Sequence, residues 1–464
     1  MSLLSPTWTA VAYLVAASCF ILALKGLSAP GTARRGNLIG AGGGVLAVLI
    51  SFISNDLDHV GLIVGAIVIG SAAGVPAARL VAMTQMPQLV ALFNGVGGAA
   101  AALVAGIEMA DASDVSAIAA AAGGFTVLVG TVSFSGSVIT FMKLQGLMTT
   151  RKVTYPGGPF VFGGSLLAAV ALAAAVVVDL ADATLNPPLL GALAAVSLIV
   201  GVLFVLPVGG ADVPIVISLL NAFTGLSVAA SGYVLGNVLL LVAGTLVGAS
   251  GTILTRLMAA AMGRSLTSTL FGAFKAHAVV AAGSVEDRPV RSGSAEDVAI
   301  LLGYARKVII VPGYGLAVAQ AQHTLCELAE LLESRGIEVL YGIHPVAGRM
   351  PGHMNVLLAE ANVPYEVLKE MDEVNPQFAT ADVALVVGAN DVVNPAAKTS
   401  PGAPIYGMPI LEVGDAQQVV FLKRSMRPGF AGIENELLYD PKTMLLFGDA
   451  KESLSKVVTS VKNL

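Results

Sequence analysis

Charged residues and cysteines are scarce in this chain, and each scarcity excludes some classes of protein. Only 12% of its 464 residues are charged, whereas 56% are hydrophobic and the mean hydropathy is +0.83, so the chain is no ordinary soluble domain. A net charge of −5 without a basic patch argues against a nucleic-acid partner. Cys19 and Cys326 are far apart, so they offer neither a disulfide framework nor a metal-binding spacing, which fits a reducing cytosol.

Long apolar stretches fill the first half of the chain. Nine of them have roughly 18 to 25 residues, which is enough to cross a bilayer. They predict membrane helices at residues 7–27, 37–54, 60–83, 87–107, 116–141, 159–178, 188–207, 213–233 and 235–258. The first stretch has no basic segment before it and no convincing cleavage site, so we expect a retained span rather than a signal peptide.

The few charges in this half support an odd number of spans. The first 275 residues contain ten lysines and arginines and eight aspartates and glutamates. With nine spans, all ten basic residues lie on one side of the membrane and seven of the eight acidic residues on the other. The positive-inside rule then places the N-terminus outside and the domain that follows the ninth span in the cytoplasm.

The spans are rich in glycine and alanine, which predicts a tight bundle without a wide pore. No duplicated filter-like loop suggests an ion channel. Polar groups at this depth are costly and are therefore candidates for function. They include Asn94, Asn221 and a serine series ending at Ser137, with Asp212 at the start of the eighth span. Two interpretations stay open: these groups support a water file for protons, or they hydrogen-bond neighbouring helices.

The remainder of the chain alternates strands and helices. We predict strands at residues 307–311, 338–343, 365–368, 383–387, 404–409 and 418–423, and helices at 315–335, 351–361, 376–381 and 450–461. Such alternation gives a doubly wound parallel sheet with its ligand at the carboxyl ends of the strands. The sequence therefore predicts a polytopic α-helical membrane bundle (1–262), a polar linker (263–297) and an α/β Rossmann-like domain (298–464).

A glycine pattern follows the first predicted strand of that domain. Gly313-x-Gly315-x-x-Val318 lies between an apolar β-branched run and a helix-forming stretch, as a dinucleotide fingerprint requires. Gly313 permits a tight bend, Gly315 lets the backbone approach a pyrophosphate, and the helix amides face its negative charge. The alternative is that turn chemistry alone explains the glycines.

The ends of two other strands bear on which dinucleotide is bound. NAD sites usually carry an acid at the end of the second strand, but here that strand runs into His344. Lys423 and Arg424 end the strand at 418–423 and suit the 2′-phosphate of NADP, although a solvated basic strand end is the alternative. A Pro- and Gly-containing loop at 425–432 can act as a lid. His344 and His353 lack a ligand-like spacing, so we expect surface roles and no metal site.

Several segments carry a resemblance to a known family. They are residues 210–221, 311–320, 343–352, 388–395, 423–426 and 429–432. Over essentially its whole length the chain resembles the β subunit of proton-translocating NAD(P) transhydrogenase of bacterial type. The resemblance implies nucleotide contacts at Gly313, Tyr314, Gly315, Val318, Arg349, Asn390, Asp391, Lys423, Arg424, Gly429, Phe430, Ala431 and Gly432.

The roles of these residues are likewise what the resemblance implies. Arg349 helps hold the pyrophosphate, Lys423 and Arg424 bind the 2′-phosphate, and 429–432 closes over NADP(H). Asp391 lies near the nicotinamide and takes part in coupling. Phe430 stands where some relatives have tyrosine, which removes a possible hydroxyl contact over the cofactor.

In the membrane half, the resemblance ties three polar positions to proton translocation: Ser137, Asp212 and Asn221. Some relatives have a histidine where Asn94 stands, so an obligatory histidine relay is excluded here.

The resemblance finally implies an enzyme in which NADH, bound on a partner α subunit, passes hydride to NADP⁺ bound on this chain. The transfer is coupled to proton translocation across the bacterial inner membrane. The α subunit brings the NAD(H)-binding domain and the remaining membrane helices, and this chain is homodimeric in the complex. The competing interpretation is a transporter or channel regulated by a nucleotide-sensing Rossmann domain.

Overall fold

The computed structural model describes residues 5–464 apart from 29, 55–56, 58, 112–115, 150–151, 182–185, 210–211, 264–287, 349–351, 402, 404 and 430. Within it the chain forms two compact units. The first comprises Met1–Gly209 and Val216–Thr255, and the second comprises Gly210–Ile215 and Arg256–Leu464.

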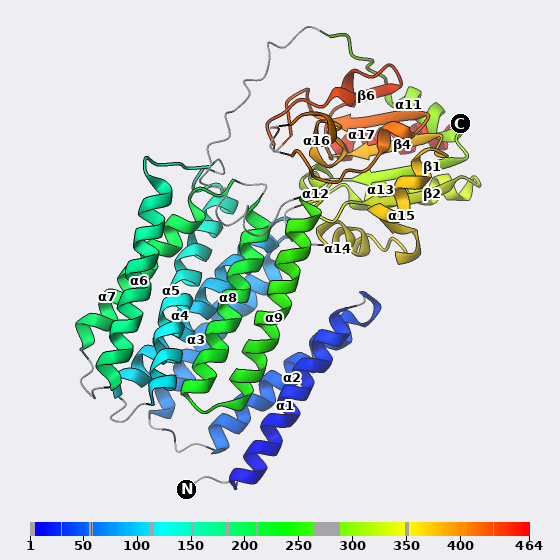
Figure 1. Cartoon of the computed structure of the whole chain (residues 1–464). Coiled ribbons are helices and arrows are strands. Elements are labelled where there is room, and N and C mark those ends of the chain that lie inside the picture. Colours follow the sequence, from blue (N-terminus) through cyan, green and yellow to red (C-terminus); the bar gives the residue numbers. More distant parts are fainter. Residues whose placement is uncertain are drawn as a thin grey trace. The chain divides into compact units, whose positions relative to one another are not determined.

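Nine helices in the described part before residue 264 are long and apolar enough to cross a membrane, which confirms the predicted number of spans. Their bounds are α1 (Pro6–Leu27), α2 (Pro30–Ser54), α3 (Val60–Leu80), α4 (Met86–Asp111), α5 (Ala117–Gln145), α6 (Gly158–Ala181), α7 (Pro187–Val205), α8 (Val213–Val234) and α9 (Val238–Ala261) (Figure 1). The largest difference from the sequence prediction is at α2, which begins seven residues earlier (37 − 30 = 7).

Glycines bring the backbones of neighbouring helices into contact. A Cβ atom added to Gly98 of α4 would lie 2.7 Å from the carbonyl oxygen of Gly130 in α5, and one added to Gly130 would lie 2.6 Å from that of Gly98. In α9, a Cβ on Gly244 would lie 2.3 Å from the Ala229 nitrogen of α8. The predicted close packing through small residues is therefore confirmed.

In its described residues, the second unit is built on a parallel sheet of six strands in the order β3-β2-β1-β4-β5-β6. The strands are β1 (Lys307–Pro312), β2 (Glu338–Ile343), β3 (Leu368–Glu370), β4 (Val383–Val387), β5 (Gln418–Lys423) and β6 (Thr443–Phe447). The order reverses between β1 and β4, so this doubly wound sheet has a switch point at which ligands bind in such folds.

Helices cover both faces of this sheet. They are α11 (Ala295–Gly303), α12 (Tyr314–Val318), α13 (Gln322–Ser334), α14 (His353–Glu360), α15 (Met371–Phe378), α16 (Ala396–Thr399) and α17 (Ala450–Lys462). Successive residues of a strand face opposite sides. Accordingly, Ile310 packs with α11, α13, α14 and α17, whereas Ile309 packs with α15 on the other face.

Several predicted elements differ from the observed ones. The strand predicted at 404–409 is wrong, because its described residues form turns and Gly407 adopts a φ of 83°. Strand β6 was not predicted at all. The helix predicted at 315–335 is broken between α12 and α13, where Gln320 has a φ of 49°. The helix predicted at 376–381 lies earlier, as α15, and a 3₁₀ turn (Tyr365–Val367) precedes β3.

Most of the predicted linker lies outside the described residues, so its extent stays a prediction. At its far end, Ser294 caps α11: its hydroxyl accepts the Asp297 N–H at 3.2 Å, and Asp297 accepts the Ser294 N–H at 2.8 Å. This reciprocal capping box starts the helix at Ala295.

Candidate functional site

Gly313 and Gly315 shape the turn between β1 and α12. Their N–H groups donate to the carbonyls of Val387 and Gly388, each at 2.9 Å. A Cβ added to Gly313 would lie 2.4 Å from the Ala389 Cα, and one added to Gly315 would lie 2.7 Å from the Gly388 Cα. The two glycines therefore let the turn after β1 pack directly against the turn after β4. A nucleotide role for them stays a prediction.

Two further fingerprint positions flank this contact. The ring of half-buried Tyr314 lies 6.2 Å from that of His353, measured between centroids. Val318 stands where the usual pattern has a third glycine, which lets a helix pack closely on the strand. Here α12 ends at Val318, whose side chain is 44% exposed, so no continuous helix needs a glycine at this point.

A cavity of about 510 Å³ opens beside the carboxyl ends of β1, β4, β5 and β6. Its lining comes from the end of β5 and from the segments that follow these four strands. The lining residues are Gly315, Val318, Ala319, Gly388, Ala389, Asn390, Leu422, Lys423, Arg424, Ser425, Arg427, Pro428, Gly429, Gly448, Asp449 and Ala450. The cavity therefore joins the glycine turn, the basic pair and the lid loop, which are far apart in the sequence.

Lys423 lies half-buried in this wall and is held by a neighbour on the β4 side. Its Nζ donates to the Asn390 Oδ1 at 3.2 Å and lies 3.5 Å from the Arg427 carbonyl oxygen. Burial lowers the pKa of Lys423, and the negative charge of Asp391 opposes that shift. Arg424 is exposed at the rim of the same cavity. The pair thus offers two cations: Lys423, which is held by a hydrogen bond, and Arg424, which is exposed to solvent.

The lid segment (residues 425–432) approaches the loop after β4. The Ala431 N–H donates to the Asp391 Oδ2 at 2.9 Å. A Cβ on Gly429 would lie 2.4 Å from the Asp391 Oδ1 and 2.7 Å from the Asn390 Nδ2, so only glycine fits there. Gly432 has a φ of 74°, which also favours glycine. Phe430 lies outside the described residues, as does Arg349.

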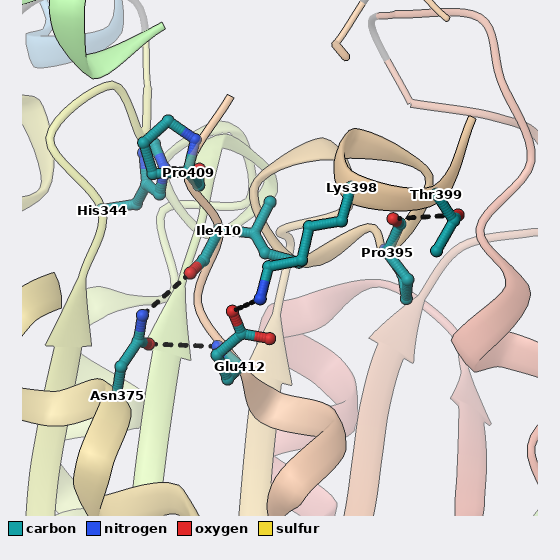
Figure 2. Close-up of polar contacts among 8 residues, drawn as sticks. All are labelled: His344, Asn375, Pro395, Lys398, Thr399, Pro409, Ile410 and Glu412. Atoms are coloured by element: carbon teal, nitrogen blue, oxygen red, sulfur yellow. Dashed lines mark hydrogen bonds and ion pairs between the residues drawn. The ribbon is translucent and has the colours of Figure 1, made fainter. Parts of the chain in front are cut away.

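His344 and His353 are both buried, so the surface roles expected for them are wrong. The Val346 N–H donates to the His344 Nδ1 at 3.2 Å, which requires a neutral ring whose Nε2–H donates to the Pro409 carbonyl at 2.8 Å. Burial lowers the pKa of His344, and the bond to Pro409 opposes that shift. Figure 2 shows His344 directed at the chain that continues from Pro409 to Glu412. At the end of β2, an imidazole therefore stands where NAD sites carry an acid.

Within the membrane helices, a polar cluster joins α4, α5 and α8. The Asn94 Nδ2 donates to the Ser137 Oγ at 2.9 Å and to the Ser133 Oγ at 3.3 Å. The Ser133 Oγ donates to the Leu220 carbonyl at 2.9 Å and lies 2.5 Å from the Thr224 Oγ1. Hydrogen bonding between helices thus accounts for much of this cluster, as one of the two open interpretations proposes.

The other predicted membrane positions lie apart from these hydrogen bonds. Among the described residues, Ser135, another serine of the series on α5, donates to carbonyls of its own helix, at 3.2 and 3.4 Å. Asn221 is half-buried on α8, immediately after Leu220. Asp212 directly precedes α8 and is 6% exposed. Their part in proton transfer stays a prediction.

Comparisons with known proteins decide the family. The family model described as the NAD(P) transhydrogenase beta subunit matches residues 9–460. Two proteins named NAD(P) transhydrogenase subunit beta, one from Rhodospirillum rubrum and one from a defined strain of that species, are each 49% identical over 465 residues. The match covers 98% of this chain and 99% of theirs. The chain belongs to the NAD(P) transhydrogenase beta subunit family.

Membership makes this chain a membrane subunit of the transhydrogenase enzyme, with an alpha subunit as its partner. The family uses NADP(H) and NAD(H), and three features of the cavity fit a phosphorylated dinucleotide. Lys423 and Arg424 supply cations. The Asn390 Nδ2 is buried without an acceptor among the described residues, so it can donate to a ligand. Gly429 keeps this amide free of side-chain cover.

Three residues that the sequence argument overlooked support these sites. Asn394 and Asn435 are almost fully buried beside the loop after β4. Lys143 is fully buried at the end of α5, and its Nζ donates to the carbonyls of Val205, Leu206 and Val208 at 3.0, 2.7 and 2.8 Å, which caps α7. Only Asn394 carried a signal, since it lies in a segment quoted for the resemblance.

Proposed function

We propose that this transhydrogenase beta subunit binds NADP(H) in the cavity beside β4 and β5. There it accepts hydride from NADH held on the alpha subunit, and it couples the transfer to proton movement across the membrane. Hydride carries two electrons, so the products are NAD⁺ and NADPH. The nicotinamide supplies the redox chemistry, and this chain supplies binding, orientation and gating.

Recognition of the nucleotide rests on the cavity wall. Lys423 and Arg424 bind the 2′-phosphate, with Arg424 in a bidentate arrangement. To do so, the Lys423 ammonium exchanges its contact with the Asn390 Oδ1 for a phosphate oxygen. The pyrophosphate lies against the turn of Gly313 and Gly315, with Arg349 assisting.

Gating of the site rests on Asp391 and the lid segment. The carboxylate already accepts the Ala431 N–H, so the position of the lid and the state of Asp391 are linked by a direct hydrogen bond. A two-position element of this kind can alternate between nucleotide exchange and hydride transfer. Closure of the lid would also exclude water from the reacting nicotinamides.

Proton movement would use the polar groups of the membrane helices. Asn94 and Ser137 share a hydrogen bond in the interior of the bundle, whereas Asn221 and Asp212 lie on α8 and at its start. With no histidine in mid-span, these groups would act together with water. By the positive-inside rule the N-terminus is outside and the nucleotide domain is cytoplasmic, in a bacterial inner membrane. Two copies of this chain would lie in the complex with the alpha subunits.

The observation that carries the proposal is the meeting of Lys423, Arg424 and Asn390 in one cavity at the carboxyl edge of a doubly wound sheet. Replacing Lys423 and Arg424 together by alanine should weaken NADP⁺ binding by about a hundredfold or more, since a hydrogen bond to a charged group contributes about 1.5–3 kcal/mol. Titration of the full chain in detergent with NADP⁺ and with NAD⁺ measures this.

A matched control exists on the same domain. Arg306 and Lys456 are an exposed arginine and lysine, and Arg306 precedes β1 at the amino edge of the sheet. Alanine at both should leave NADP⁺ affinity intact. An unchanged NADP⁺ affinity in the Lys423–Arg424 variant would show that the 2′-phosphate is bound elsewhere.

A further inference from the structure

Asn394 and Asn435 share an unusual arrangement of hydrogen bonds. In each, the side-chain Oδ1 accepts the N–H two residues further on, from Ala396 at 3.0 Å and from Leu437 at 3.1 Å. Each oxygen thus closes a local Asx turn and leaves the side-chain NH₂ group to reach elsewhere. Asn394 is 0% exposed and Asn435 is 1% exposed, so both NH₂ groups need partners within the protein.

The two NH₂ groups cross the same gap in opposite directions. Asn394, in the loop after β4, donates to the Glu434 carbonyl at 2.9 Å. Asn435, directly after Glu434, donates back to the Asn390 carbonyl at 3.3 Å and lies 3.4 Å from the Asn390 Oδ1. The loop that contains Asp391 and the chain that leaves the lid are therefore joined by a reciprocal pair of amides.

Burial increases from the lid to the segment that contains Asn435. Residues 424 and 425 and residues 427 and 428 are exposed, whereas Asn435 is buried. Arg288 holds the joint from another side, with its guanidinium 3.4 Å from the Glu434 carboxylate and 4.3 Å from the Tyr439 ring centroid. This ion pair is half-exposed and contributes little energy, but it places a third segment against Glu434.

We propose that Asn394 and Asn435 are positioning residues that form the pivot of the lid and set how fast NADP(H) leaves the site. The inference rests on the proposed function, because it takes the cavity as the NADP(H) site. The two amides fix the far end of the lid to the loop that carries Asn390 and Asp391. The exposed part of the lid then moves about a fixed point, and its Ala431 N–H returns to Asp391 at each closure.

The test uses serine at each position in the full chain. A serine hydroxyl can close the local turn in the same way as the asparagine oxygen, but it cannot cross to the opposite segment. Asn394→Ser and Asn435→Ser therefore remove only the crossing donor. Each should speed the release of NADPH about tenfold, since one such bond contributes up to about 1.5 kcal/mol. Stopped-flow displacement of NADPH by excess NADP⁺, followed by NADPH fluorescence, measures the rate.

Asn375 offers a matched control on the same edge of the sheet. Its side chain also accepts a backbone N–H, from Glu412 at 3.1 Å, and donates to a backbone carbonyl, that of Ile410, at 3.0 Å (Figure 2). Asn375→Ser should lower the melting temperature as the two test variants do, yet leave NADPH release unchanged. Asn394→Ser should also keep its affinity for 2′,5′-ADP, because its crossing bond does not reach Lys423.

Each outcome decides something. Faster release in both test variants, with normal release in Asn375→Ser, supports the pivot. Unchanged release in both, or equal acceleration in all three variants, overturns it while the NADP(H) site stands. A wild-type chain without preference for NADP(H) over NAD(H) overturns the proposed function itself.

Discussion

Lys423 shows how burial affects a charged side chain in the proposed nucleotide site. It is half-buried, and this burial lowers the pKa of its ammonium group. The same group donates a hydrogen bond to the neutral Asn390 Oδ1. The sequence located this residue correctly at a strand end. It could not reveal the Asn390 contact, because that contact exists only once β4 and β5 pair in the sheet.

The lowered pKa predicts a pH dependence of NADP⁺ binding. The 2′-phosphate favours the protonated ammonium, so affinity should fall as the pH rises through the pKa of Lys423, up to about tenfold per pH unit. That fall should begin below the ordinary lysine value of about 10.4. Lys423→Arg should remove it, because arginine does not titrate in this range.

Titrations of the full chain with NADP⁺ across the alkaline range test this prediction. NAD⁺ lacks the 2′-phosphate and serves as the reference ligand. The same alkaline loss in wild type and in Lys423→Arg would assign the titration to another group.

At the scale of elements, a helix or strand could be predicted best where its sequence pattern extends over many residues. Each span is a strongly apolar helix of 19 to 29 residues, so the nine spans could be identified despite errors at their ends. Strand β6 has five residues and follows the irregular segment after the lid, so its pairing with β5 decides its structure. The start of α11 could have been predicted, since Ser294 and Asp297 have capping-box spacing.

The residues at the strand ends of the candidate site could be predicted from the sequence, but the contacts between distant segments could not. The glycine turn and the basic pair were found because each ends a strand. The Asn394–Asn435 pair was missed because it links segments 41 residues apart (435 − 394 = 41) through side-chain amides, which have no sequence pattern. His344 was misjudged because its burial depends on the distant Pro409.

The contact between α4 and α5 predicts a position-specific effect of one methyl group. Gly98→Ala places a Cβ 2.7 Å from the Gly130 carbonyl oxygen, so the helices must separate, at a cost of about 1–3 kcal/mol. Gly106→Ala, on the same helix, places its Cβ 3.8 Å from the Leu190 side chain, which is an ordinary contact. Thermal unfolding in detergent should show a lower melting temperature for Gly98→Ala alone. Equal melting of the two variants would contradict the packing described.

At the scale of the whole molecule, the chain combines a set of membrane helices with a doubly wound parallel sheet that we propose binds NADP(H). One glycine fingerprint and one basic strand end provide for one nucleotide, and transhydrogenation needs two. We propose that the second is bound by the alpha subunit, the partner that membership of the family implies. The proposed division accounts for a basic pair, Lys423 and Arg424, at the end of β5 and for the lack of an acid at the end of β2.

The most direct test of this account is made with the chain and its alpha subunit in proteoliposomes that carry an internal pH indicator. NADH and an NADP⁺ analogue are added outside, and both hydride transfer and internal pH are recorded. The account predicts that the analogue is reduced only when the alpha subunit is present, that the internal pH changes together with the reduction, and that replacing Lys423 and Arg424 by alanine removes both signals. Reduction without any pH change, or a pH change that needs nucleotide binding but no hydride transfer, would contradict it, and the second result would favour a nucleotide-regulated transporter.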